Sequence, residues 1–280
     1  MPIYQPSELH QFLKEQGLSP RKGLSQNFLI DGNILRKIVA SAHVEADDWV
    51  VEIGPGPGAL TEQLLNTGAH VIAIEKDSGM AKTLSRLQQD DRLAIFCDDI
   101  MQFPLEETLK AHLPVGKKAK LIANLPYHLT TPILIQFVRQ SNRFSSLTVM
   151  VQDEVARRFT AKPKTSAYGS ITVFLNVYAT VSYAFRVSRN CFYPQPNVDS
   201  AIVTFQLHPP HQLEDPDDFF KITRRAFEQR RKMMKRSLSE MIEPQKIETA
   251  LQACSLPPNS RPEELSLEQW RAFYHEIKKI

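Results

Sequence analysis

A short apolar run that leads directly into a glycine-rich turn is the feature that most constrains the fold of this chain. Trp49 to Ile53 has the pattern of a buried strand, Gly54-Pro55-Gly56-Pro57-Gly58 that of a turn, and an apparent helix follows through Leu65. Residues without a Cβ let a ligand approach the backbone, and a helix N-terminus directs its unpaired amides at that ligand. The segment therefore predicts a nucleotide-type site at the end of a strand.

The spacing of these glycines favours some ligands over others. Gly-x-Gly-x-Gly departs from the Gly-x-Gly-x-x-Gly pattern of nicotinamide enzymes, and two prolines stiffen the turn. Glu75 closes the next apolar run, 21 positions after Gly54, where an acidic side chain accepts hydrogen bonds from both hydroxyls of a ribose. A strand-to-helix turn that binds nothing is the alternative, and Glu75 disfavours it.

Further apolar runs predict the other strands of a sheet, and amphipathic segments separate them. Strands that alternate with helices indicate a parallel sheet covered on both faces. Ser200 to Leu207 alternates and suits a later strand, antiparallel at the edge of the sheet, whereas Ser170 to Val181 has a mixed pattern. We expect about seven strands in this sheet. The runs are Val71 to Glu75, Leu93 to Cys97, Ala119 to Ala123 and Leu147 to Val151.

The pattern changes after the last predicted strand. Pro209, Pro210 and the acidic stretch from Glu214 to Asp218 indicate a linker, and every periodic segment from Phe219 onward is helical. A chain of 280 residues exceeds the usual size of one domain. We therefore expect a sheet domain over residues 1–208, with an N-terminal helical extension, and a helical domain over 209–280.

The helical region carries most of the positive charge. The segment from Phe219 to Glu240 contains eight Lys and Arg and two Glu, so its net charge is +6. The net charge of the whole chain is +3, so the rest of the chain has −3. Drawn as one helix, most of these cations share one face, which predicts contacts with phosphate; a solvated face is the alternative. Arg230 lies in the apolar arc, so it either pairs with a buried acceptor or the helix breaks near Gln229. The residues expected to contact phosphate are Lys221, Arg224, Arg225, Arg231, Lys232 and Lys235.

The cysteines and the hydropathy of the chain disfavour disulfide-stabilised, zinc-binding, membrane and secreted proteins. The cysteines are odd in number, far apart and unpaired in spacing, so neither a disulfide framework nor a zinc site is expected, and no metal is assigned. No apolar stretch approaches the ~18 residues of a membrane span, and the first residues lack the apolar run of a signal peptide. These features predict a cytosolic protein without a membrane partner.

The segment Asn124-Leu125-Pro126-Tyr127 follows a predicted strand and suggests specific chemistry. The lone pair of an exocyclic amine on an aromatic base is delocalised into the ring, which makes the amine a poor nucleophile. The amide oxygen of Asn124 and the carbonyl of Leu125 could accept its two N–H groups and localise that lone pair as it attacks a methyl donor. Pro126 stiffens the turn and Tyr127 offers a ring for stacking. An ordinary turn is the alternative, which the upstream Gly54 and Glu75 disfavour.

Together these motifs resemble the ribosomal RNA adenine N6-dimethyltransferases that use S-adenosylmethionine. Three further segments support the resemblance, which spans nearly the whole chain: Leu24 to Leu29, Phe192 to Ser200, and Arg225 to Lys232. It implies an α/β fold, with a Rossmann-like class I methyltransferase sheet and a small all-helical C-terminal domain for RNA recognition. The implied activity is dimethylation of two adjacent adenosines at N6, near the 3′ end of small-subunit ribosomal RNA, during ribosome biogenesis.

The resemblance also assigns roles to individual residues. Phe192 would stack on the target adenine opposite Tyr127, and the contact of Asp99 with the adenine of the donor could shift by one residue to Asp98. The residues implied to contact S-adenosylmethionine are Asn27, Leu29, Gly54, Glu75, Asp99 and Asn124; those implied to act in catalysis are Asn124, Leu125, Pro126, Tyr127 and Phe192.

Two alternatives share these motifs. One is a large-subunit adenine methylase of the antibiotic-resistance type, which the long segment at Phe192 and the basic block Gln229 to Lys232 disfavour. The other is a non-catalytic RNA-binding assembly factor, which would be expected to have a broken motif. We expect a monomer whose partner is an immature small ribosomal subunit.

Overall fold

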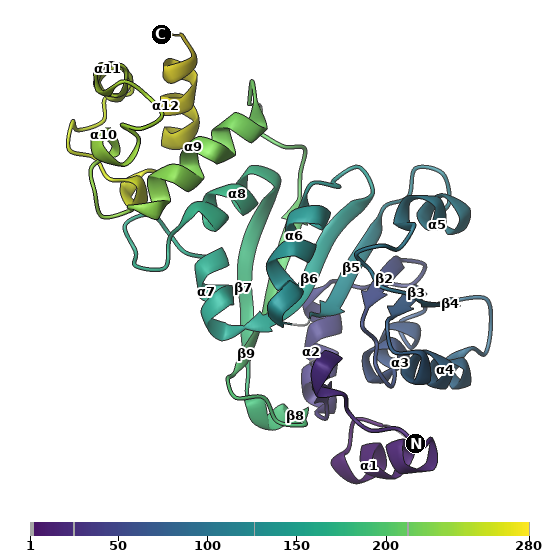
Figure 1. Cartoon of the computed structure of the whole chain (residues 1–280). Helices are drawn as coiled ribbons and strands as arrows, with labels where there is room; N and C mark the ends of the chain where they lie inside the picture. Colours follow the sequence, from purple (N-terminus) through teal and green to yellow (C-terminus); the bar gives the residue numbers. More distant parts are fainter. Residues whose placement is uncertain (1–2, 25, 126, 212, 280) are drawn as a thin grey trace. The chain divides into compact units, whose positions relative to one another are not determined.

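A computed structural model describes residues 3–24, 26–125, 127–211 and 213–279 of the chain. Its contacts form two compact units, shown in Figure 1: Met1–Ala156 with Ser182–His208, and Arg157–Val181 with Pro209–Ile280. The boundary near residue 208 is where the sequence predicts a linker. Residues 157–181 differ from the expected division, because they pack with the C-terminal helices.

The first unit is built on a seven-stranded sheet in the order β4-β3-β2-β5-β6-β9-β7. β2 pairs in parallel with β3 and β5, whereas β9 runs antiparallel to β6. The predicted number of strands in this sheet and the antiparallel orientation of β9 are confirmed. The prediction that β9 lies at the edge of the sheet is wrong, because β7 is the edge strand. The bounds are β2 Trp49–Ile53, β3 His70–Glu75, β4 Leu93–Cys97, β5 Ala119–Asn124, β6 Phe144–Gln152, β7 Ala179–Val187 and β9 Ser200–Leu207.

The central strands are buried on both faces, which explains their continuous apolar runs. Val50, Val51, Ile72 and Leu121 are each at most 1% exposed. In β7, by contrast, most residues are partly or fully exposed, so the strand lacks such a run. The mixed pattern of Ser170 to Val181 arises because a helix, α8 (Ser170–Tyr178), passes directly into this strand.

Helices connect the strands and extend the N-terminus (Figure 1). They are α1 Pro6–Glu15, α2 Gly32–Ser41, α3 Ala59–Leu65, α4 Ser78–Thr83, α5 Leu105–His112, α6 Thr130–Val138 and α7 Asp153–Phe159. A second, two-stranded sheet pairs β1 (Phe28–Leu29) with β8 (Phe192–Tyr193). The direction of winding reverses between β2 and β5, and ligands of such sheets bind beyond the strand ends at that point.

The second unit is helical and has its own core. Phe219, Trp270 and Phe273 are fully buried there, and the ring of Phe174 in α8 lies 4.8 Å from that of Phe220. These aromatic contacts explain why α8 belongs to this unit. Its other helices are α9 Pro216–Glu228, α10 Met234–Ser237, α11 Pro244–Ala253 and α12 Leu267–Lys279.

The single helix expected from Phe219 to Glu240 is wrong, because α9 ends at Glu228. Gln229 leaves the helical conformation, with φ −125° and ψ 45°. Of the two alternatives for Arg230, the helix break is the one in this structure. The guanidinium of Arg230 also donates to the carbonyl of Ser166, an exposed residue, and lies 3.4 Å from the carboxylate of Glu263. Within the described ranges, no helix is long and apolar enough to cross a membrane.

Candidate cofactor and active site

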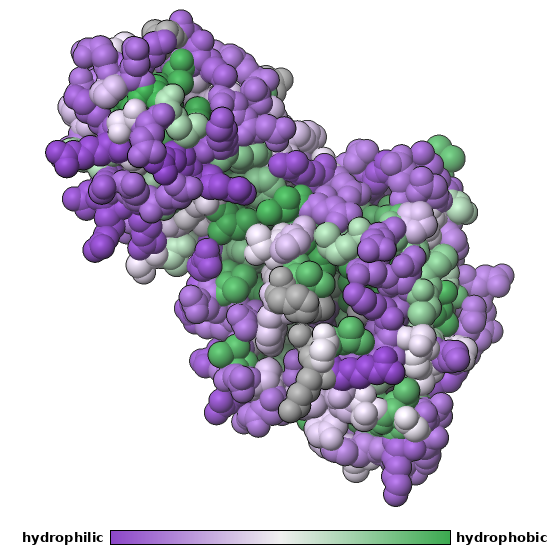
Figure 2. Space-filling model, in the orientation of Figure 1, coloured by the Kyte–Doolittle hydropathy of each residue, from purple (hydrophilic) through white to green (hydrophobic). Residues whose placement is uncertain are grey.

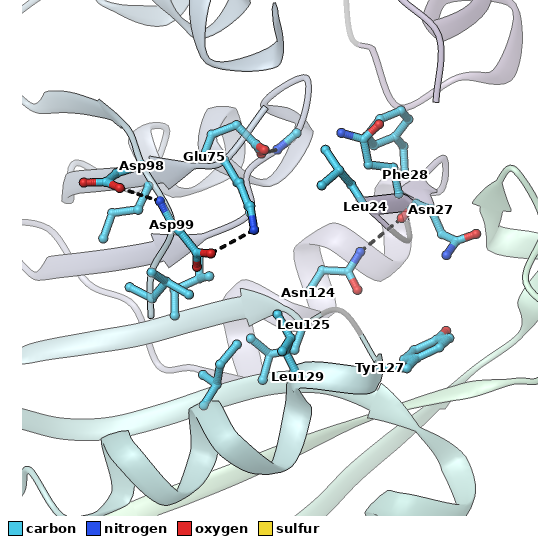
Figure 3. Close-up of a pocket in the computed structure, with 18 of the residues that line it drawn as sticks. Leu24, Asn27, Phe28, Glu75, Asp98, Asp99, Asn124, Leu125, Tyr127 and Leu129 are labelled. Carbon is cyan, nitrogen blue, oxygen red and sulfur yellow. Dashed lines mark hydrogen bonds and ion pairs between the residues drawn. The ribbon is translucent and has the colours of Figure 1, made fainter. Parts of the chain in front are cut away.

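A pocket in the first unit lies at the carboxyl ends of β2, β3, β4 and β5, and the chain before β1 forms one of its walls. Figure 3 shows Asp98 and Asp99 at one end, Tyr127 at the other, and Asn124 between them. The pocket brings together eight of the residues singled out in the sequence: Asn27, Gly54, Glu75, Asp98, Asp99, Asn124, Leu125 and Tyr127.

The glycine-rich turn needs its glycines for conformation and for space. Gly54, Gly56 and Gly58 have φ values of 67°, 56° and 91°, which side chains rarely adopt. A Cβ on Gly56 would also lie 3.0 Å from the ring of Phe28. The backbone of the turn is therefore the surface that a ligand would meet.

Glu75 ends β3 and its carboxylate is held in place by backbone amides. The side chain is 6% exposed; Oε2 accepts from the amide of Gly56 at 2.9 Å and Oε1 from the amide of Asp77 at 2.8 Å. Burial raises the pKa of Glu75, and these amide bonds oppose that shift. The backbone amide of Lys76 also bonds to this carboxylate and lowers its pKa, so the end of β3 presents a carboxylate that is held by several amides beside the pocket.

Asp98 and Asp99 both line the pocket, so their positions do not distinguish which of them would contact the adenine of the donor. The oxygens of Asp99 accept from Lys76 Nζ at 2.8 Å and from the amide of Met101 at 3.0 Å. Lys76 holds the pKa of Asp99 below its usual value. Asp98 uses Oδ1 to accept from the amide of Asp99 at 2.7 Å. Both carboxylates retain acceptor positions.

The side-chain amide of Asn124 has a defined orientation. Its Nδ2 donates to the carbonyl of Asn27 at 3.1 Å, as drawn in Figure 3. A carbonyl can only accept, so Nδ2 must face Asn27 and Oδ1 points elsewhere. Leu125 follows and is buried, and Pro126 lies outside the described residues. No group of the described residues donates to Asn124 Oδ1, so this oxygen is available to an external donor.

Tyr127 begins a short 3-10 helix, Tyr127–Leu129, and its ring lines the pocket. Its hydroxyl hydrogen-bonds to Ser200 Oγ at 2.9 Å. Burial raises the pKa of the phenol, which keeps it neutral. The ring is thus anchored at its polar end.

Phe192 and Leu29 do not lie in this pocket. They pair across the β1–β8 sheet and are 3% and 8% exposed. Phe192 is buried in the core of the first unit, so its ring is not presented to the pocket in this structure, and its expected stacking opposite Tyr127 stays a prediction. Phe28 lines the pocket instead of Leu29, as alternation of side chains along a strand requires.

The residues expected to contact RNA fall into two groups. Arg225 pairs with Glu228 and Glu240, and Lys235 with Glu248. The other four are exposed and have no ion-pair partner in the part of the chain that the structure describes: Lys221, Arg224, Arg231 and Lys232. Arg231 and Lys232 line a hollow with Arg230 and Arg261, and the surface in Figure 2 is largely hydrophilic over this unit.

Comparison with known proteins gives the family. The model of the family described as ribosomal RNA adenine dimethylase matches residues 17–279. The chain belongs to this family. A ribosomal RNA small subunit methyltransferase A from Protochlamydia amoebophila is 56% identical over 99% of this chain and 98% of its own length. The protein of that name from Chlamydia trachomatis is 46% identical over 98% of each chain.

Solved structures agree with the fold. A dimethyladenosine transferase from Plasmodium falciparum superposes with a TM-score of 0.74 at 23% identity, over 90% of this chain and 98% of its own. The 23S rRNA methyltransferase ErmE gives 0.68 at 24% identity, over 90% and 100%. Identities this low support the fold alone. The fold expected from the sequence, a class I methyltransferase, is confirmed.

Proposed function

We propose that this protein transfers methyl groups from S-adenosylmethionine to N6 of two adjacent adenosines near the 3′ end of small-subunit ribosomal RNA. The observation that carries the proposal is the orientation of Asn124, whose Nδ2 faces Asn27 and whose Oδ1 remains available in the pocket that holds Glu75. The names of the relatives favour the small subunit over the large one.

The pocket fits S-adenosylmethionine in the chemistry of its walls. Gly54 and Gly56 present backbone without side chains, and Glu75 places a carboxylate at the end of β3, where it would accept from ribose hydroxyls. Asp98 or Asp99 would accept from the adenine amine of the donor. When bound, the cofactor supplies an electrophilic methyl group.

The residues of the chain act on the attacking amine. Asn124 Oδ1 and the Leu125 carbonyl accept its two N–H groups, which localises the lone pair on nitrogen and orients it. No strong base is needed, since the amine proton becomes acidic as the new N–C bond forms and then passes to water. Tyr127, anchored through Ser200, offers its ring to the target base. Phe192 would have to become exposed to complete a clamp.

The exposed cations of the second unit suit ribosomal RNA. Lys221, Arg224, Arg231 and Lys232 are free to meet phosphates, and we assign the recognition of an immature small subunit to this surface. We propose that the protein acts as a monomer in the cytosol, where such subunits assemble.

Methyl transfer from a labelled donor tests this function directly. Immature small subunits should accept two methyl groups on each of two adjacent adenosines, and large subunits should accept none. Transfer to large subunits, or a product with one methyl group per adenosine at completion, would contradict the assignment.

A further inference from the structure

A buried carboxylate beside the pocket fastens the chain that forms one pocket wall. Asp77 is 2% exposed and precedes α4, where Oδ1 accepts from the amides of Gly79 and Met80 at 2.9 and 3.3 Å. Its other oxygen, Oδ2, accepts from Gln26 Nε2 at 3.2 Å and lies 3.4 Å from Arg21 Nε. One oxygen thus caps the helix and the other holds the N-terminal chain.

The bond between Gln26 and Asp77 has a fixed direction. The backbone amide of Arg21 donates to Gln26 Oε1 at 2.8 Å, so the Oε1 atom of Gln26 is occupied. Its Nε2 must therefore donate to a group that accepts, which the carboxylate of Asp77 does. An amide at position 77 could face Gln26 with its own NH2 group, and two donors would then oppose each other.

The fastened chain also touches the proposed catalytic residue. Leu24, Gln26, Asn27 and Phe28 line the pocket, and the carbonyl of Asn27 accepts from Asn124 Nδ2. The chain is therefore attached to α4 through Gln26 and to the end of β5 through Asn27. Asp77 itself does not line the pocket, and its direct link to a pocket residue is through its backbone amide, which donates to Glu75 Oε1 and is retained in any substitution except proline.

We propose that Asp77 is a positioning residue, which holds Gln26 and Arg21 so that this chain closes the donor pocket and sets the Asn27 carbonyl against Asn124. This inference rests on the proposed function. It assigns to Asp77 a role beyond capping α4. The two roles separate experimentally, because asparagine caps a helix as well as aspartate but cannot accept from Gln26 in the same arrangement.

The test reverses donor and acceptor. Asp77→Asn should weaken binding of S-adenosylmethionine in calorimetry and slow methyl transfer, each by about tenfold, the loss expected for a hydrogen bond to a charged group. Gln26→Glu should also be impaired, because two carboxylates then face each other. Combining Asp77→Asn with Gln26→Glu should restore most of the binding and the rate, since the carboxylate introduced at position 26 accepts both from the amide of Arg21 and from the amide introduced at position 77.

Two further variants keep the test decisive. Gln26→Leu leaves Asp77 and its cap intact, and should reduce affinity with little change in melting temperature. Asp31→Asn is the matched control, because Asp31 caps α2 through Asn33 and Ile34 and makes no contact with Gln26, so it should bind the donor like the wild type. Hydrogen exchange tests directly whether this chain is held less firmly. Exchange at Leu24 and Asn27 should be faster in Asp77→Asn and should return to the wild-type rate in the double variant.

The outcomes distinguish this role from the proposed function. Wild-type affinity and rate in Asp77→Asn, or a double variant no better than the single ones, would overturn the positioning role while leaving the methyltransferase assignment intact. A wild-type protein that neither binds S-adenosylmethionine nor methylates small subunits would overturn the proposed function, and with it this role.

Discussion

The amide of Asn124 illustrates how one hydrogen bond selects a residue type. Its Nδ2 is held by the carbonyl of Asn27, which directs Oδ1 towards the position assigned to the target amine. An aspartate would place a carboxylate oxygen against that carbonyl, and two acceptors repel each other. Asparagine is therefore the side chain that satisfies both neighbours.

We expect Asn124→Ala to lower the single-turnover rate by on the order of a hundredfold or more, because a preorganised acceptor is lost. The Asn124→Asp enzyme should be slow as well. Its carboxylate would turn away from the Asn27 carbonyl, and its acceptor oxygen would then no longer be directed at the target amine. Donor affinity, measured by calorimetry, should change much less than the rate in both variants. A rate within about threefold of wild type in Asn124→Ala would contradict the role.

Glu52 is a second residue whose environment determines its chemistry. It lies within β2, 2% exposed, and accepts from Thr61 Oγ1 at 2.7 Å. Burial raises its pKa to about 8, so the side chain stays protonated near neutral pH. The sequence analysis did not single it out, although an acid within an otherwise apolar strand was a visible signal.

This burial predicts a pH dependence of stability. Between its ordinary pKa of 4.5 and about 8, Glu52 holds its proton in the folded state and loses it in the unfolded state, so the free energy of unfolding falls as pH rises. Glu52→Gln removes this dependence. We would measure the free energy of unfolding of both proteins by urea denaturation. Across that window, the stability of the variant relative to the wild type should rise by at most ~1.4 kcal/mol per pH unit. Parallel curves for the two proteins would contradict the shift.

At the scale of elements, the β1–β8 pair gives the Phe192 segment a structural role. Phe192 lies opposite Leu29 and belongs to the same core cluster of the first unit as Leu35 and Ile202. The same short sheet fixes Phe28, whose ring lines the pocket. Loss of the Phe192 ring should therefore affect the pocket through packing.

We expect Phe192→Ala to destabilise the protein by about 3 to 5 kcal/mol, as for other buried phenylalanines, and to weaken donor binding through Phe28. Phe192→Leu should retain most of the stability and most of the donor affinity. Thermal denaturation and calorimetry on the two variants check this. A Phe192→Ala protein with wild-type stability and donor affinity but slow turnover would instead support a base clamp.

At the scale of the whole molecule, the charge is unevenly distributed: +6 lies between residues 219 and 240 of a chain whose net charge is +3. The structure divides these cations by their partners. Arg225 and Lys235 are neutralised by glutamates, whereas Lys221, Arg224, Arg231 and Lys232 have no such partner among the described residues. Affinity for RNA phosphate should come mainly from the second group.

Changing those four residues to Gln should flatten the salt dependence of RNA binding. Each lost phosphate contact lowers the slope of log affinity against log salt by about 0.7 to 0.9. Arg225→Gln is the control and should change the slope less, because its charge is already paired. Fluorescence anisotropy with a small-subunit RNA fragment at several salt concentrations measures both. Equal slopes in the fourfold variant and the wild type would mean that this face is only solvated.

Local sequence determined the parts of the protein that depend on local physics. Short runs of apolar and β-branched residues specify strands, so β2, β4 and β9 begin and end where the sequence predicts. Glycine spacing and an acid at the next strand end specify the donor pocket, because parallel strands bring their carboxyl ends to one edge. The family followed from the same motifs.

Only the tertiary structure decided the features that depend on partners distant in the chain. The basic region is divided at Gln229, where α9 has ended, and the next residue, Arg230, bonds to Ser166 and Glu263 in other segments. The burial of Phe192 requires its pairing with Leu29, and the orientation of Asn124 requires the carbonyl of Asn27, 97 residues away. Periodicity reports which side of an element is apolar, but it carries no information on which distant group completes a hydrogen bond or covers a ring.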